Sequence, residues 1–175
     1  MSWTDRAKSC IDWDERDEER LRSLRAWVKP EQDAFVEGLI ARVTQLDGGP
    51  RFVLNGRLAE RLHTLLDEWL SGLLAPACDD AERQESRRDL GRRLARLDVG
   101  YEHIILLEGI ASRSFLSVIT KNLSGRADEL PPVLDALHKA LTHDRVLVHA
   151  GFMEQRDTEM EQALLDRFLA ITGFS

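Results

Sequence analysis

Apolar residues recur every three to four positions along most of the chain, which is the spacing of one face of an α-helix. Stops at proline and glycine divide this pattern into segments. The spacing predicts a short element at Arg51–Leu54 and long helices at Asp14–Val28, Glu31–Gln45, Arg57–Leu74, Asp80–Leu97, Tyr101–Leu123 and Pro132–Ile171. We therefore expect an all-α domain of about seven helices with short connections.

The segment Tyr101–Leu123 is apolar on more than one face. A helix of that kind is either central in the core or shared with a partner. We expect both, with the last two long helices forming an antiparallel four-helix bundle at a symmetric homodimer interface. A purely central core helix is the alternative. The residues expected at the interface are Ile104, Leu107, Glu108, Phe115, His149 and Phe152.

Charge and composition narrow the possible partners and the compartment. A formal net charge of −7 in 175 residues argues against a nucleic-acid surface, because phosphate binding needs a clustered basic excess. The one dense basic run, Arg83–Arg96, alternates with acidic residues and indicates a solvated helix face. Glu108 and Arg113 make the most apolar segment too polar for a membrane span. The two cysteines form no pair and the N-terminus has no signal-peptide core, so we expect a cytoplasmic protein.

The sequence carries no pattern typical of an enzyme or of a metal site. The serines of Tyr101–Leu123 lie inside a predicted helix rather than on a strained turn, and no Gly-rich phosphate loop occurs. His138, His143 and His149 are separated by five and six residues, and neither separation places two of them on one face as a metal-binding pair at i, i+4 would. We expect neither catalysis nor a bound metal ion.

Several strings between about Asp14 and Phe152 resemble the sensor globin domains of globin-coupled sensors. That family has a segment of the type R-x-x-I-G-x-x-H-x-x-I-G-L-x-P-x-W-Y, and RRDLGRRLARLDVGYEHI at Arg87–Ile104 aligns with it without a gap. RLAERLHTLLDEWLSGLL is similar to the family's helix over the distal side of the haem, and LHKALTHDRVLVHAGF is similar to its last helix. The resemblance implies a globin-like fold with a haem pocket.

The sequence departs from the family at the residues that would hold haem. Leu94 occupies the position of the proximal histidine. On the distal side, a Phe-Tyr pair is replaced by Leu39-Ile40 and a Thr-Gln pair by Leu65-Leu66. An iron centre needs an axial donor, which leucine cannot supply. We therefore expect no cofactor. In this respect the chain resembles the non-haem globins of RsbR-type stressosome proteins, which keep the fold and the dimer without haem.

Two other histidines leave a haem-binding alternative open. His103 lies beyond the Asp98-Val99-Gly100 turn, near the end of the aligned segment, and His63 lies one or two positions from the apolar stripe of the distal-type helix. Either would serve as a non-standard axial ligand in a gas or redox sensor. A small apolar ligand, such as a fatty acid, is also possible in the space that haem leaves, anchored by Arg92, Arg93 or Arg96.

The expected organisation is a globin-like sensor domain at residues 1–154, followed at residues 155–175 by the start of a helical linker to a C-terminal output domain. The linker prediction rests on apolar residues at helical spacing, Met160, Leu164, Phe168 and Ile171. The expected function is signal transduction: a haem-free regulatory domain that dimerises and relays an input to the effector.

Overall fold

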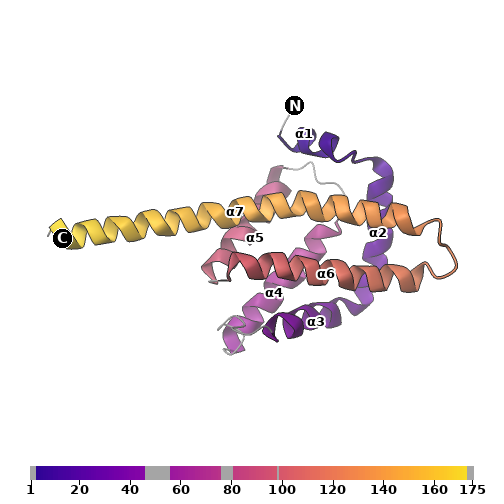
Figure 1. The fold of residues 1–175 in the computed structure, drawn as a ribbon, viewed down its shortest axis with the longest axis horizontal. Coiled ribbons are helices and arrows are strands. Elements are labelled where there is room, and N and C mark those ends of the chain that lie inside the picture. The colour runs from indigo at the N-terminus through magenta and orange to yellow at the C-terminus, as the bar shows by residue number, and fades with distance from the viewer. Residues whose placement is uncertain (1–2, 46–55, 76–80, 98, 173–175) are drawn as a thin grey trace.

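The computed structural model describes residues 3–45, 56–75, 81–97 and 99–172. All of the regular structure in these ranges is helical: α1 (Trp3–Cys10), α2 (Glu15–Val28), the 3-10 helix η1 (Lys29–Glu31), α3 (Gln32–Thr44), α4 (Gly56–Leu73), α5 (Ala81–Arg96), α6 (Tyr101–Asn122) and α7 (Leu130–Thr172) (Figure 1). The expectation of an all-α, globin-like fold is confirmed. The element predicted at Arg51–Leu54 lies outside the described residues.

Helix α2 begins at a reciprocal cap. The backbone N–H of Asp17 donates to Asp14 Oδ1 at 2.9 Å, and the backbone N–H of Asp14 donates to Asp17 Oδ2 at 3.0 Å. The first of these bonds lowers the pKa of the Asp14 carboxyl. Asp17 is fully buried and also accepts from Lys139 Nζ of α7 at 3.0 Å. Asp17, the third helical residue of this capping box, therefore also fixes α2 against α7.

Helix α1 was not predicted from the sequence. Its eight residues, WTDRAKSC, carry no continuous apolar stripe. The chain leaves α1 through Asp12, which has a positive φ of 50°. Asp12 also accepts a hydrogen bond from Lys139 Nζ at 2.9 Å through its backbone oxygen. Aspartate tolerates this left-handed conformation better than most residues do. The hydrogen bond from Lys139 fixes the turn to α7.

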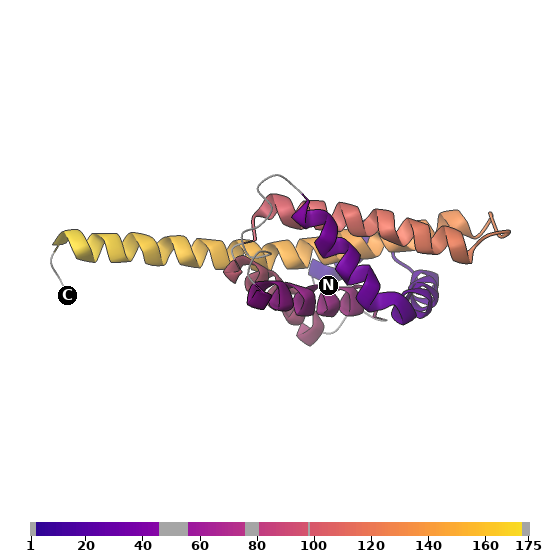
Figure 2. The same ribbon diagram turned by 90° about the horizontal axis from the view of Figure 1, so that it is seen from below.

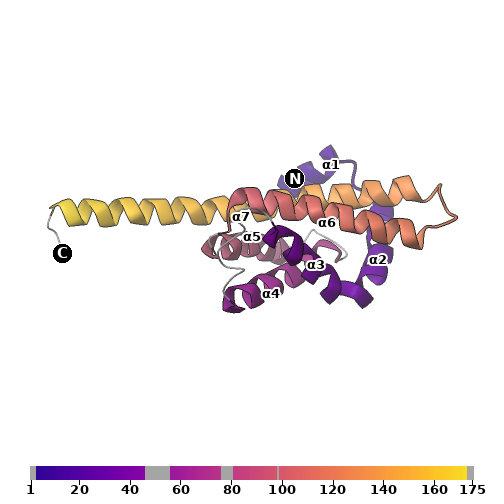
Figure 3. The ribbon, with the colours of Figure 1, turned by 60° about the horizontal axis from the view of Figure 1, so that its bottom comes forward.

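Helices α6 and α7 form an antiparallel pair, and α3, α4 and α5 lie on one side of that pair (Figure 3). One continuous core fills the space between the helices. Most of its large, fully buried side chains come from α2, α3, α4 and α6, and they include Leu24, Val36, Leu39, Leu62, Leu70, Phe115 and Ile119. Burial of the apolar faces that the spacing predicted is the main force holding these helices together.

Helices α5 and α7 cross with their backbones in close approach. The crossing is formed by glycines on both helices. A Cβ atom on Gly91 of α5 would meet the carbonyl oxygen of Val148, and a Cβ atom on Gly151 of α7 would meet the carbonyl oxygen of Arg88. Only glycine lets the two backbones approach this closely. Gly91 belongs to the Leu-Gly string of the aligned segment, so the crossing gives that string a structural role.

The C-terminal part of α7 extends beyond the body of the domain as a single helix (Figures 1 and 2). Almost every described side chain after Gln155 is exposed, and the exposed fraction reaches 84% at Ile171. The exposed apolar side chains of this part are Met160, Leu164, Leu165, Phe168, Leu169 and Ile171. An apolar face of this size on an isolated helix is typical of an interaction surface.

The residues expected at a dimer interface lie mostly inside a single chain, and that assignment has to be corrected. Ile104, Leu107, Glu108, Phe115 and Phe152 are all buried in the protomer, and His149 is half-buried. Because α6 is apolar on several faces, its sequence pattern does not show which face is turned inward. The outward face of the α6–α7 pair carries Tyr101, Ile105, Leu106, Leu116, Val146 and Met153 instead.

By length and composition alone, α6 is the one helix of the described residues that would pass as a membrane span. Core helices of soluble proteins pass the same test, and the inward face of α6 packs in the core between α3 and α7. The expectation that the chain has no membrane span stays a prediction.

Candidate functional site

The candidate site lies between α4 and α5. It contains positions that flank the haem in the family that the sequence resembles. Leu65, Leu66 and Trp69 of α4 lie opposite Leu94 of α5. Ile104, Leu107 and Glu108 of α6 close the space between them. The structure therefore brings together the distal pair Leu65-Leu66 and the residue in the proximal position. Leu39 and Ile40, the other two distal positions, pack in or against the core but do not line this space.

The space enclosed by these residues measures about 20 Å³. A cavity needs roughly 10–15 Å³ to hold one water molecule, whereas pockets for drug-sized ligands measure about 300–1,000 Å³. Leu65 and Leu66 are each 4% exposed and Leu94 is 5% exposed, so the side chains themselves fill the centre. With these leucines in place, the pocket has no room for a porphyrin ring and supplies no axial nitrogen.

The two alternative haem ligands do not line this cavity. His103 lies in the first turn of α6, half-buried, with its Nδ1 atom 3.4 Å from Glu102 Oε1. His63 is half-buried on α4, beside Leu62 of the core. Neither histidine faces Leu94 across the space, so the present geometry does not fit haem ligation by either of them.

Glu108 is the one ionisable side chain among the residues that line the cavity. Its side chain is 8% exposed and accepts a hydrogen bond from Arg145 Nε of α7 at 2.5 Å. Burial raises the pKa of the Glu108 carboxyl, and Arg145 partly offsets that rise. Arg145 is 52% exposed, so this pair connects the cavity to the outer surface. Glu108, expected at the dimer interface, is thus buried within the protomer and paired with Arg145 of the same chain.

A buried polar network joins three helices beside the cavity. Trp69 Nε1 of α4 donates to Asp144 Oδ2 of α7 at 2.8 Å. Arg87 Nε of α5 donates to Asp144 Oδ1 at 2.5 Å, and Arg87 also donates to the backbone oxygen of Trp69 at 3.2 Å. All three side chains are buried. The charge of Arg87 is therefore compensated inside the protein by Asp144.

This network corrects the interpretation of Arg83–Arg96 as an entirely solvated face. Arg87 lies three, four and seven residues before Leu90, Gly91 and Leu94, which places it on the buried face of α5. That spacing is a signal in the sequence that the alternating charges concealed. The carboxylate that Arg87 needs lies 57 residues further along the chain, where no local pattern would identify it.

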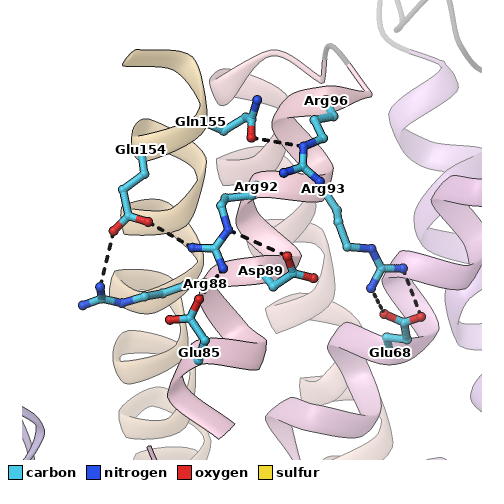
Figure 4. Close-up of polar contacts among 9 residues, drawn as sticks. All are labelled: Glu68, Glu85, Arg88, Asp89, Arg92, Arg93, Arg96, Glu154 and Gln155. Atoms are coloured by element: carbon cyan, nitrogen blue, oxygen red, sulfur yellow. Dashed lines mark hydrogen bonds and ion pairs between the residues drawn. The ribbon is translucent and has the colours of Figure 1, made fainter. Parts of the chain in front are cut away.

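The remaining arginines of α5 lie nearer the surface and contact both neighbouring helices (Figure 4). Arg88 and Arg92 each contact Glu154 of α7, at 3.3 and 3.1 Å. Arg93 contacts Glu68 of α4, and Arg96 Nε donates to Gln155 Oε1 of α7 at 3.1 Å. Hydrogen bonds from the arginines to Glu85 and Glu68 raise the pKa of Arg92 and of Arg93, respectively. α5 is thus connected to the residues from which α7 leaves the domain.

Residues with metal-binding side chains do not gather in the described part of the chain. No group of three histidine, cysteine, aspartate or glutamate side chains there has a geometry suited to a metal ion. His143 is buried with its ring 6.4 Å from that of Trp13, whereas His138 is exposed. The three histidines of α7 therefore lie in different surroundings, as their spacing indicated.

Comparison with known proteins gives one result for this fold. A family model with the description Protoglobin matches residues 2–158. No match was found among curated proteins. Members of the matched family normally bind haem. The matched range includes α4, α5, α6 and the part of α7 that packs on the domain.

Proposed function

The chain belongs to the protoglobin family, and from that premise we propose that it is a globin-type sensor domain that works without haem. A haem-binding member of such a family needs a proximal nitrogen and space for a porphyrin ring. Here Leu94 stands against Leu65 and Leu66 across a cavity of about 20 Å³. This packing is the observation that carries the proposal. The likeness to the non-haem domains of RsbR-type stressosome proteins is part of the same proposal.

The second candidate is a haem-binding gas or redox sensor, and the family's usual cofactor favours it. His103 would be the ligand best placed for it, because the next residue, Ile104, lines the cavity. That function requires α4, α5 and α6 to separate and the leucines to leave the centre. The loss of their packing against Trp69 and Leu107 would oppose such an opening.

The proposal predicts the absorption spectrum of the protein after incubation with haemin. We expect the broad spectrum of free haemin, without a sharp Soret band, because no imidazole reaches the space between Leu65 and Leu94. Leu94→His is expected to leave the spectrum unchanged. The variant would supply an imidazole for the haem iron, but the cavity would still be too small for the porphyrin ring.

The controls for this experiment are His103→Ala and His63→Ala. A sharp Soret band in the unmodified protein that disappears in either variant would contradict the haem-free proposal and establish haem ligation by the substituted histidine. A band that appears only in Leu94→His would show that the side chain at this one position decides haem binding.

We also propose that the domain forms a homodimer through the outward face of the α6–α7 pair. This face carries a groove of about 640 Å³ whose lining includes the small residues Gly109 and Ser112 and the apolar residue Leu116. Leu116 is 44% exposed, and Ile105 on the same helix is 45% exposed. Small residues flanked by exposed apolar ones let a helix of a second copy approach closely, and a two-fold axis would place the same face on both sides.

The double variant Ile105→Glu, Leu116→Glu is expected to convert the dimer to a monomer in sedimentation-velocity runs. Two carboxylates on each copy would oppose their equivalents across the symmetry axis and would lie in an apolar contact. Ala41→Glu, at an exposed position of α3, is the matched control and should sediment as the unmodified protein does. Sedimentation of the unmodified protein as a strict monomer would contradict the proposal.

The projecting part of α7 is the proposed relay to a C-terminal effector. Its exposed apolar face suits contact with another helix or domain. The contacts of Arg88, Arg92 and Arg96 with Glu154 and Gln155 connect the start of this part to α5, the helix that carries Leu94. A change at the cavity would therefore be transmitted to α7 through α5. We propose a regulatory rather than an enzymatic role, in the cytoplasm.

A further inference from the structure

A second hollow lies between α4 and α5, next to the apolar cavity. It measures about 310 Å³ and is lined by Arg61, Thr64 and Leu65 of α4 and by Arg93, Arg96 and Leu97 after them in the chain. Leu65 lines both spaces, so its side chain separates the hollow from the cavity. We refer to these six residues as the arginine groove. Its volume lies at the lower end of the range of small-molecule sites.

Two of the three arginines of this groove, Arg61 and Arg96, have no carboxylate partner among the described residues. Arg87, Arg88 and Arg92 each contact a carboxylate. Arg93 is neutralised by Glu68, but the only side chain that Arg96 contacts in the described structure is the uncharged Gln155. No ion pair or side-chain hydrogen bond joins Arg61 to another residue of the described ranges. The groove thus holds two arginines that have no carboxylate partner among the described residues, in a chain of net charge −7.

We propose that the arginine groove binds an organic carboxylate with a small apolar body. A guanidinium group offers two parallel N–H donors to a carboxylate, and Arg61 and Arg96 supply such groups from both sides of the groove. Leu65 and Leu97 offer apolar contact to the remainder of the molecule. An inorganic anion would use only the charges and would leave these leucines uncovered.

Binding there would act on α7 through Arg96. The same guanidinium that faces the groove donates to Gln155 at the point where α7 leaves the domain. A carboxylate that draws Arg96 into the groove competes with Gln155 for it. Glu68 competes in the same way for Arg93 (Figure 4). Removing the side chain of Gln155 or the charge of Glu68 is therefore expected to strengthen binding of the carboxylate. Unfolding of a variant would weaken binding and could not produce this result.

The test is a titration of the purified full chain, followed by NMR chemical shifts or calorimetry, with hexanoate, hexanamide and inorganic phosphate as probes. We expect hexanoate to bind with a Kd of about 1 mM or below, and phosphate and hexanamide to bind at least about tenfold more weakly. Arg61→Gln and Arg96→Gln should each weaken hexanoate binding by about tenfold or more, since each removes a charged hydrogen bond. Gln155→Ala and Glu68→Gln should strengthen it.

Arg126→Gln is the matched control, because Arg126 lies in the turn between α6 and α7 and pairs with Glu129 at an exposed site. Its hexanoate affinity should equal that of the unmodified protein. The proposal is overturned if hexanoate does not bind, if phosphate or hexanamide binds as tightly, or if Arg61→Gln and Arg96→Gln bind it unchanged. None of these outcomes depends on the haem spectrum or on the oligomeric state, so the proposed function stands or fails separately.

Discussion

Asp144→Ala is expected to lower the free energy of unfolding by about 3–5 kcal/mol, the usual cost of removing one partner of a buried ion pair. The side chain of Asp144 accepts from both Arg87 and Trp69 in the interior of the domain. Its loss leaves the guanidinium of Arg87 buried without a counterion and the indole N–H of Trp69 without this acceptor. Urea unfolding followed by circular dichroism measures the change, with the slope of the transition checked for two-state behaviour.

Two further variants isolate the cause of this loss. Glu154→Ala removes a carboxylate that contacts Arg88 and Arg92, but all of these groups are solvent-exposed to some degree, so we expect a cost below about 1 kcal/mol. The double variant Arg87→Met, Asp144→Leu removes both charges, and we expect it to recover most of the stability lost in Asp144→Ala. Equal losses in Asp144→Ala and Glu154→Ala would show that the buried network contributes no more than a surface pair.

The helices of this chain could be predicted from apolar spacing because burial of a single stripe determines most of them. The predicted stripe of α4 extends from Leu58 to Leu73. The side chain of Leu58 lies outside the described part of the chain, and the large apolar members from Leu62 onward are buried. The prediction of α2 began one residue early, at Asp14, which is the cap itself. Helix α1 has no stripe, and tertiary contacts such as those of Lys139 with Asp12 hold its end. Such contacts are not visible in a local pattern.

Helix α6 shows where the apolar pattern stops being informative. Ile104 and Leu107 are buried, while their neighbours Ile105 and Leu106 are 45% and 40% exposed. All four are large and apolar, so their spacing fits an inward face in more than one orientation. Only the packing of the neighbouring helices against α6 decides which of them enter the core. Ile104, Leu107, Glu108 and Phe115, which the sequence analysis placed at an interface, are therefore core residues of the protomer.

The candidate site could be predicted in part, because family resemblance identifies positions but not volumes. It placed Leu94 opposite Leu65 and Leu66, and the structure brings these three together. It also placed Leu39 and Ile40 in the pocket, which they do not line. The small volume of the cavity also depends on Ile104, Leu107 and Glu108 of α6, which do not belong to the two distal pairs compared with the family. A sequence motif does not specify how closely these side chains pack.

Gly91→Ala and Gly151→Ala are each expected to destabilise the fold, because both residues lie where α5 and α7 cross. The added methyl group would overlap the carbonyl oxygen of Val148 in the first variant and that of Arg88 in the second. Both obstacles are backbone atoms of a helix, so relief requires the two helices to separate. Overpacking of this kind costs about 1–3 kcal/mol, and we expect values at the upper end because no flexible side chain can move aside.

Gly38→Ala is the matched control for the crossing. Gly38 lies inside α3, and nothing lies within 4 Å of the position of an added Cβ atom. Alanine is a better helix former than glycine by about 0.8–1.0 kcal/mol, so this variant should be more stable than the unmodified protein. The same substitution is thus expected to have opposite signs at the two kinds of site in thermal and urea unfolding. If Gly91→Ala and Gly151→Ala also gained stability, the backbones of α5 and α7 would not be in contact, and the route from Leu94 through α5 to the projecting part of α7 would lose its physical basis.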